Sequence, residues 1–248
     1  MISALAITYN EEQQMERFIN SLDFADEIII VDSNSTDETV KIAERLGAKV
    51  YKRAFDNYSN QKNYALELAK NNWVVFFDLD ETIPNSLADE IKVASELPSN
   101  IVAYKVKRQF FFMGKRIKHS GFQNDWVYRL FDKRFCQFND SPVHEQLLTN
   151  GPTGRLKNIS EHYTYKDFDH YNQKLTNYSK LQAEQLYIKN LRPNLYHFLF
   201  RPWYRFFHQY IIKLGVLDGK EGFILAYLSG FAVFKRYLQL WLMYRNID

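Results

Sequence analysis

Three acidic residues follow a short apolar run near the middle of the sequence. Trp73 to Phe77 is apolar throughout, and Asp78, Asp80 and Glu81 come soon after it. An apolar run of this length predicts a buried strand, and Asp78 and Asp80 point to one side if the strand continues. A turn after Leu79 would gather Glu81 with them. Hard divalent cations prefer such oxygen ligands and leave other positions to a substrate's phosphates, so this stretch predicts a metal site.

The same letters fit two enzyme classes, and a third interpretation needs no chemistry. Asp78 to Thr82 resembles the Asp-x-Asp-x-Thr motif of haloacid-dehalogenase-type phosphatases, in which Asp78 would be a phosphorylated nucleophile. An Asp-x-Asp also holds the metal in many transferases that use sugar nucleotides. The phosphatase motif normally follows the first strand, whereas three strand-like segments precede this one, which favours the transferase. A solvated turn after a strand is the remaining alternative.

The segments around the acidic run alternate between strand-like and helix-like patterns. Strands are expected at residues 2–8, 27–31 and 48–51. The first expected helix follows the first strand, and the second runs from a capping box at 35–38 to about Leu46. Two more helices are expected at 60–71 and 84–97. Asn10 suits the N-cap of the first helix. Short links between strands and helices predict an α/β fold with a doubly wound parallel sheet, which binds ligands at the carboxyl ends of its strands. Asp32 lies at such an end, and Lys62 could reach a diphosphate or be a solvated lysine.

The pattern changes after residue 100. Residues 101–113 and 126–131 are rich in β-branched and aromatic residues, which predicts antiparallel strands, with a hairpin turn at Gly114. The polar residues of this region include Asp125, Arg129, Glu145 and His162. A polar helix is expected from about residue 167 to 189. We expect the antiparallel part to cover the acceptor side of the site.

Charge and cysteine content limit the class of protein. The formal net charge is only +3, which argues against a generic nucleic-acid binder, although residues 192–248 carry eight Lys or Arg against three acids. The single cysteine, Cys136, excludes an intramolecular disulfide and fits a reducing compartment. The sequence passes from Met1 directly into a strand-like segment without the features of a leader peptide. We therefore expect a cytoplasmic protein.

The segment from Leu195 to Arg245 is dense in aromatic and aliphatic residues interleaved with Arg and Lys. Its longest uncharged run, 222–234, is shorter than the roughly 20 residues that a spanning helix needs. Basic groups beside apolar faces suit interfacial helices on an anionic membrane leaflet. The alternative is that these faces pack on the body or in a dimer. Pro202 and the glycines at 215 and 219 are expected to divide the segment into at least two helices.

Several motifs, in order and spacing, resemble the family 2 glycosyltransferases of GT-A fold. They are Thr8–Glu12, Val31–Asp37, Gln61–Asn63 and Phe77–Glu81. Three more extend the resemblance to the bacterial branch that includes the lipopolysaccharide-core β-1,4-glucosyltransferases, namely Arg129–Phe131, Val143–Glu145 and His162–Tyr163. The resemblance covers about residues 2–190. Lys62 stands where relatives often have Arg, so a bidentate phosphate contact would be replaced by a point charge.

The resemblance implies a GT-A domain over residues 1–190, with a Rossmann-like, mostly parallel sheet. From the residue pattern described above we expect an amphipathic, membrane-associating helical tail over 191–248. It implies inverting transfer of a sugar from a nucleoside diphosphate donor, such as a UDP-sugar, to a lipopolysaccharide-type or lipid-linked acceptor on the inner face of the membrane. Tyr9, Asn10, Glu12 and Asp32 would hold the nucleoside end of the donor, and Lys62 and Asp78 would contact the diphosphate.

The resemblance also implies roles for the acidic residues. Asp80, helped by Asp78 and approached by His162, would bind Mg²⁺ or Mn²⁺. The general base would be Glu145, oriented by His144, with Asp125 as second candidate.

The third alternative, besides transferase and phosphatase, is a non-catalytic membrane-associated scaffold built on a degenerate transferase.

Overall fold

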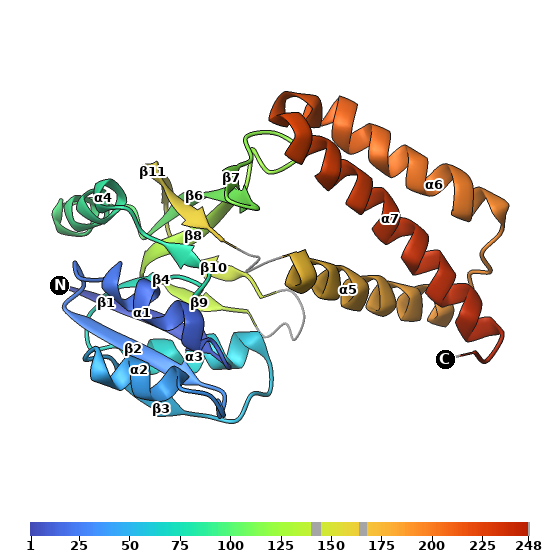
Figure 1. Ribbon diagram of the computed structural model, residues 1–248. Helices are drawn as coiled ribbons and strands as arrows, with labels where there is room; N and C mark the ends of the chain where they lie inside the picture. Colours follow the sequence, from blue (N-terminus) through green and yellow to red (C-terminus); the bar gives the residue numbers. More distant parts are fainter. Residues whose placement is uncertain (140–144, 164–167, 248) are drawn as a thin grey trace. The chain divides into compact units, whose positions relative to one another are not determined.

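The computed structural model describes residues 1–139, 145–163 and 168–247, apart from the side chain of residue 170. Its contacts divide the chain into two compact units (Figure 1). The first, here called the sheet unit, comprises residues 1–108 and 125–162, and the second, the helical unit, comprises residues 109–124 and 163–248. Helix α5 (Phe168–Ile188), expected within the 1–190 domain, belongs to the helical unit by its contacts. The functional boundary at residue 190 stays a prediction.

The strand order is β3-β2-β1-β4-β8-β6-β11-β5, and β7 pairs with β6. The strands are β1 (Ile2–Thr8), β2 (Glu27–Asp32), β3 (Lys49–Lys52), β4 (Trp73–Phe76), β5 (Glu81–Thr82), β6 (Ala103–Phe112), β7 (Lys115–Arg116), β8 (Trp126–Asp132) and β11 (Thr153–His162). The pairs β1–β2, β2–β3 and β1–β4 are parallel, whereas β8 runs antiparallel to β4 and β6. The predicted α/β fold of GT-A type, parallel first and antiparallel after residue 100, is confirmed.

Helices cover both faces of the sheet in the first unit (Figure 1). They are α1 (Glu12–Asn20), α2 (Thr39–Arg45), α3 (Tyr58–Leu68) and α4 (Asn85–Glu96). One core cluster joins the sheet to α1, α2 and α4. The other joins it to α3 and to the hairpin of β9 (Cys136–Phe138) and β10 (Leu147–Thr149). Because both faces are covered, strands β1 and β2 read as continuous apolar runs rather than alternating ones.

Two expected helix starts are wrong, and side chains between the loops explain both. Asn10 is not an N-cap: its φ is +54°, and its Oδ1 accepts a hydrogen bond from Thr36 N at 2.8 Å. Helix α2 begins at Thr39 instead of within the capping box, because Ser35 and Thr36 bond to Asp32 and Asn10 respectively. These polar residues therefore join two loops at the carboxyl edge of the sheet.

The helical unit contains α5 and the antiparallel pair of α6 (Leu195–Phe207) and α7 (Gly219–Tyr244) (Figure 1). Helix α7 contacts both α5 and α6. Pro202 was expected to break the segment, but it lies inside α6. The π-helical turn His208–Ile212 follows α6. The break comes just after this turn, at Leu214, which has a φ of +58°. No helix among the described residues is long and apolar enough to cross a membrane.

Side-chain hydrogen bonds and close backbone packing fix the start of α7. The carboxylate of Asp218 accepts hydrogen bonds from the backbone N–H groups of Lys118 and His119 and from the hydroxyl of Ser120, at 2.8 to 3.2 Å. A Cβ added at Gly222 would lie 1.9 Å from the carbonyl oxygen of Gly215, so only glycine allows this approach. The segment 118–120 and the turn before α7 are thereby held together.

Candidate functional site

The acidic run forms a tight turn at the end of β4. Strand β4 stops at Phe76, and the backbone N–H of Glu81 donates to the carbonyl oxygen of Asp78 at 2.9 Å. This turn brings one carboxylate oxygen from each of Asp78, Asp80 and Glu81 to within 4.8 Å of one another. The gathering of Glu81 that the sequence predicted is confirmed.

Arg129 lies beneath this turn and pairs with two of the three acids. It projects from β8, which pairs with β4, and only 5% of it is exposed. Its guanidinium donates to the carboxylates of Asp78 and Glu81, and to the carbonyl oxygen of Phe76 at 3.0 Å. Sequence reasoning recorded Arg129 only as part of a motif and missed this role. An arginine directly before the apolar Leu130 and Phe131 was the available signal.

Arg108 adds a second positive charge. Its Nη1 lies 3.7 Å from a carboxylate oxygen of Asp78 and 3.7 Å from one of Glu81. Its other nitrogens donate to both oxygens of Asp125, at 2.9 and 3.2 Å. Asp125, the second candidate for the base, is therefore held in a bidentate ion pair on the far side of Arg108 from the acidic turn.

Burial and charge act in opposite directions on these carboxyl groups. Burial alone would raise the pKa of Asp78, but the charges of Arg129, Lys62 and Arg108 lower it below its usual range. The pKa of Glu81 is raised, chiefly by its complete burial and further by the charge of Asp78. Asp78 is therefore ionised at neutral pH. Glu81, which also accepts from the Ser160 hydroxyl at 3.0 Å, serves to anchor the turn.

Asp80 differs from its two neighbours because one of its oxygens lacks a partner. Its Oδ2 lies 3.2 Å from Nε2 of His162, which β11 places opposite Glu81 in the register of β5. Its Oδ1 is buried and has no hydrogen-bond partner among the residues that the structure describes. An unsatisfied carboxylate oxygen beside a second carboxylate is a donor set that fits a divalent cation.

The residues predicted to hold the nucleoside lie on two loops that are joined by hydrogen bonds. Asp32 is fully buried, and its carboxylate accepts from the backbone N–H and the hydroxyl of Ser35. Glu12 accepts from the backbone N–H of Glu38 at 3.0 Å. The pairing of Thr8 with Asp32 places Tyr9, which is 58% exposed, next to this loop pair.

A cavity of about 500 Å³ joins Asp78 to Lys62 and Glu145. Lys62 is only 7% exposed, so the interpretation as a solvated lysine is wrong. Its ammonium lies 2.9 Å from Oε1 of Glu145 and 5.3 Å from the ring centroid of Phe138. Arg108 and Arg129 also line this cavity, whereas Asp125 does not. His144, predicted to orient Glu145, lies outside the described residues.

Comparisons with known proteins agree with this fold. Residues 3–164 match the model of glycosyl transferase family 2. An uncharacterized glycosyltransferase of Rickettsia bellii is 32% identical, over 96% of this chain and 85% of that protein. The lipopolysaccharide core biosynthesis glycosyltransferase LpsC of Rhizobium meliloti is 26% identical, over 95% of this chain and 93% of that protein.

A crystal structure of glucosyl-3-phosphoglycerate synthase from Mycobacterium tuberculosis, with Mn²⁺, uridine diphosphate and glucosyl-3-phosphoglycerate, also matches. It covers 45% of this chain and 44% of its own, at 26% identity. Its TM-score is 0.38, and at that score no property of the site follows from it.

Proposed function

The chain belongs to the family 2 glycosyltransferases, and from this premise we propose that it transfers a sugar, with inversion, from a nucleoside diphosphate donor to a glycan acceptor. The observation that carries the proposal is the acidic turn, where Asp80 keeps a buried oxygen without a partner among the described residues. A phosphatase with Asp78 as nucleophile does not agree with membership of this family.

Asp80 and Asp78 would hold Mg²⁺ or Mn²⁺, with the imidazole of His162 next to Asp80. The bound metal would neutralise charge on the leaving diphosphate. Arg129 engages Oδ2 of Asp78 from below and fixes the direction of that carboxylate. Glu81 is fully buried against Arg129, so it supports the turn and is not a ligand in this proposal.

Glu145 is the proposed general base because it lines the same cavity as Asp78. Its carboxylate would accept the proton of the acceptor hydroxyl as that oxygen attacks the anomeric carbon from the face opposite the diphosphate. Lys62 now holds this carboxylate. A donor diphosphate would compete for the Lys62 ammonium and free Glu145, so donor binding would prepare the base. Asp125 remains the second candidate.

The two joined loops would receive the nucleoside. In this proposal the exposed ring of Tyr9 contacts the base, and Asp32, Asn10 and Glu12 give the pocket its shape and polar groups. A UDP-sugar is the proposed donor. Direct bonds from the carboxylate of Asp32 to the nucleoside would require it to exchange one of its bonds to Ser35.

The proposed acceptor is a lipopolysaccharide-type or lipid-linked glycan at the inner face of the cytoplasmic membrane. Support comes from the similarity over 95% of this chain to LpsC, a lipopolysaccharide core biosynthesis glycosyltransferase, and from exposed aromatic residues on α6. These are Tyr196, Phe200, Trp203, Tyr204 and Phe207. Peripheral contact through such rings beside basic residues is the proposed mode of membrane association.

Calorimetric titration of nucleoside diphosphates and their sugars, with and without Mn²⁺, tests the donor site. We expect metal-dependent binding of one nucleotide by the wild type, its loss in Asp80→Ala, and its retention in Asp89→Ala, where an exposed acid on α4 is removed. Failure of every donor to bind the folded wild type would overturn the proposal. Equal binding by wild type and Asp80→Ala would refute the metal site alone.

A further inference from the structure

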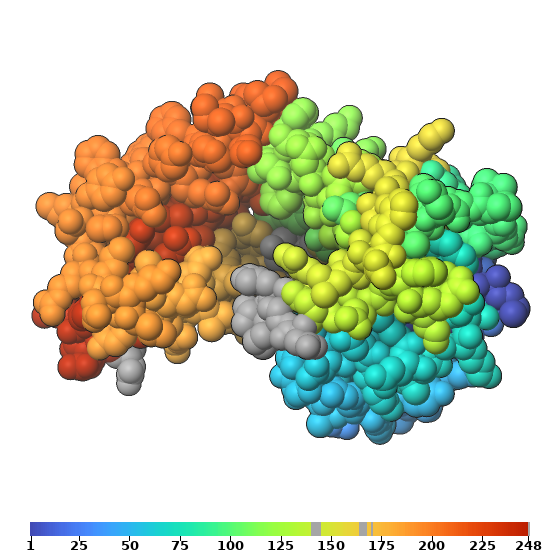
Figure 2. All heavy atoms as spheres, turned by 180° about the vertical axis from the view of Figure 1, so that it is seen from behind, coloured from blue at the N-terminus to red at the C-terminus, as the bar shows by residue number. Residues whose placement is uncertain are grey.

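The helical unit contains a cavity of about 490 Å³ that the proposed activity does not use. Helices α5, α6 and α7 all contribute to its lining, and in Figure 2 part of α7, in red, is visible between α5 and α6. Four lining side chains are cationic: Lys174, Arg201, Arg205 and Arg236. No aspartate or glutamate lines it in the part of the chain that the structure describes.

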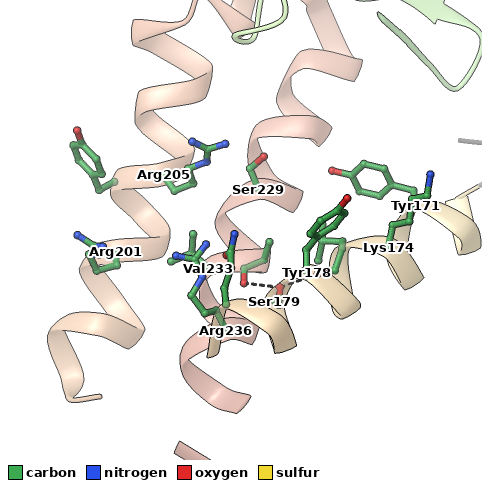
Figure 3. Close-up of a pocket in the computed structure, with 13 residues that line it drawn as sticks. Tyr171, Lys174, Tyr178, Ser179, Arg201, Arg205, Ser229, Val233 and Arg236 are labelled. Atoms are coloured by element: carbon green, nitrogen blue, oxygen red, sulfur yellow. Dashed lines mark hydrogen bonds between the residues drawn. The ribbon is translucent and has the colours of Figure 1, made fainter. Parts of the chain in front are cut away.

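The arginines converge from two helices. Arg201 and Arg205 are one helical turn apart on α6, and Arg236 projects from α7 (Figure 3). Lys174 and Tyr178 face the same cavity from α5. Since residues four apart on a helix share a face, α6 presents two guanidinium groups to one space.

The neighbours of Arg236 do not balance its charge. Its Nε is buried and has no hydrogen-bond partner in the described part of the chain. Burial lowers the pKa of Arg236, and the charges of Arg201 and Arg205 lower it further. Tyr237 acts in the opposite direction on the pKa of Arg236, and its hydroxyl also accepts a hydrogen bond from Arg201 at 3.3 Å. A partly buried cation among like charges is costly unless an anion binds there.

The adjacent residue on α7, Lys235, is a cation whose hydrogen bonds are satisfied within the same unit. Lys235 donates to Asn172 Oδ1 at 3.1 Å and to Thr176 Oγ1 at 2.7 Å, and so connects α7 to α5. It does not line the cavity. Two adjacent cations on α7 therefore differ, because Lys235 is bonded to α5 whereas Nε of Arg236 has no partner among the described residues.

We propose that this arginine pocket binds a phosphate-bearing group, either a lipid headgroup or a soluble phosphate. Guanidinium groups match phosphate oxygens with paired hydrogen bonds, and three arginines suit a group of two or more negative charges better than one carboxylate. The tyrosine and serine hydroxyls of the lining, among them Tyr178, Tyr204 and Ser229, can donate to further phosphate oxygens. All lining residues belong to the helical unit, so the inference is independent of the donor site.

The first test is calorimetric titration of the full chain with inorganic pyrophosphate in EDTA, which removes divalent metal from the proposed donor site. We expect the wild type and Asp80→Ala to bind alike, and Arg201→Gln/Arg205→Gln to bind at least about tenfold more weakly. The charge-matched control, Lys213→Gln/Lys220→Gln, changes two basic residues of the helical unit that do not line the pocket. It should stay within about twofold of the wild type. Absence of binding by the wild type, or equal weakening in both double variants, would overturn the proposal.

Arg236→Met provides a second readout that does not depend on affinity alone. Replacing a partly buried, unbalanced cation by an apolar side chain should leave Tm unchanged or raise it when no phosphate is present. The rise in Tm that pyrophosphate gives the wild type should disappear in this variant. A full pyrophosphate-induced rise in Arg236→Met would contradict the pocket, whatever its basal stability.

Vesicle flotation then distinguishes the two sources of phosphate. If the ligand is a lipid headgroup, Arg201→Gln/Arg205→Gln should lose binding to phosphatidylglycerol vesicles relative to the charge-matched control, with no binding of either to phosphatidylcholine. If both double variants float alike while only the arginine variant loses pyrophosphate binding, the pocket takes a soluble phosphate.

Discussion

The acidic turn of the sheet unit and the arginine pocket of the helical unit each leave one buried polar atom without a partner among the described residues. In the first it is Asp80 Oδ1, and in the second it is Nε of Arg236. The acidic turn also contains Arg129, which offsets two of its three acids. Among the described residues that line the arginine pocket, no carboxylate lies beside Arg201, Arg205 and Arg236. Opposite unsatisfied charges predict ligands of opposite sign, a cation at the turn and an anion in the pocket.

Removing the counter-charge of the acidic turn should have the largest effect on stability. Arg129→Met leaves Asp78 and Glu81 without their main partner and should lower the free energy of unfolding by roughly 3–5 kcal/mol in urea titrations. Arg134→Met, which removes the exposed partner of Asp132, should cost less than about 1 kcal/mol. Similar losses in both variants would show that Arg129 is not the main support of the turn.

The same variant has a defined pH dependence. Because the folded-state pKa of Asp78 is lowered, its contribution to stability is present above the unfolded value of about 4 and is lost as pH falls towards the folded value. The difference in stability between wild type and Arg129→Met should therefore shrink in urea titrations below about pH 4. A difference that grows with acidity would contradict the lowered pKa.

Replacing each candidate base by its amide should affect turnover without affecting the fold. Glu145→Gln should lower kcat by about 10²–10⁴-fold while donor binding persists, because a general base is lost. Asp125→Asn removes the charge of a residue that pairs with Arg108 and does not line the cavity, so it should lower kcat by less than about tenfold. Steady-state kinetics would measure kcat of both variants, using a donor whose binding to the protein has been established. The reverse order would assign the base to Asp125.

Close packing in the helical unit should be disturbed without loss of the donor site. Gly222→Ala places a Cβ 1.9 Å from the Gly215 carbonyl oxygen, and the resulting shift should cost about 1–3 kcal/mol of stability. Lys220→Ala, an exposed change on the same helix, is the control and should stay within about 0.5 kcal/mol. Nucleotide binding should survive in both. Its loss in Gly222→Ala would mean that the two units are not separable in function.

The smallest expected signal comes from Cys136, which reports on the sheet unit alone. Burial raises the pKa of its thiol to about 12, helped by the charge of Asp132, so the folded protein should react negligibly with a thiol reagent at about pH 8. Unfolding in guanidinium should expose one thiol per chain. In Gly222→Ala the thiol should stay protected while the helical unit melts, and early reaction would show that both units unfold together.

Local patterns in the sequence predicted much of the fold. The apolar runs of β1, β2 and β4 predicted buried strands, and short links between them predicted the parallel sheet, because these depend on neighbouring residues. The β-branched and aromatic residues after residue 100, with the turn at Gly114, likewise predicted antiparallel strands. The start of α1 could not be predicted, since Asn10 bonds to Thr36, 26 residues away, rather than capping its own helix.

The sequence by itself determined the family and the acidic turn, because Asp78, Asp80 and Glu81 are close along the chain and a single turn gathers them. Only the tertiary structure decided their partners. Arg129 is 51 residues from Asp78, and Glu145 is 83 residues from Lys62. The arginine pocket depends on the packing of three helices, and Pro202 lies inside one of them, α6. Side chains distant in sequence come together only in the folded chain, and so the tertiary structure decided the charge balance of the acidic turn and of the arginine pocket.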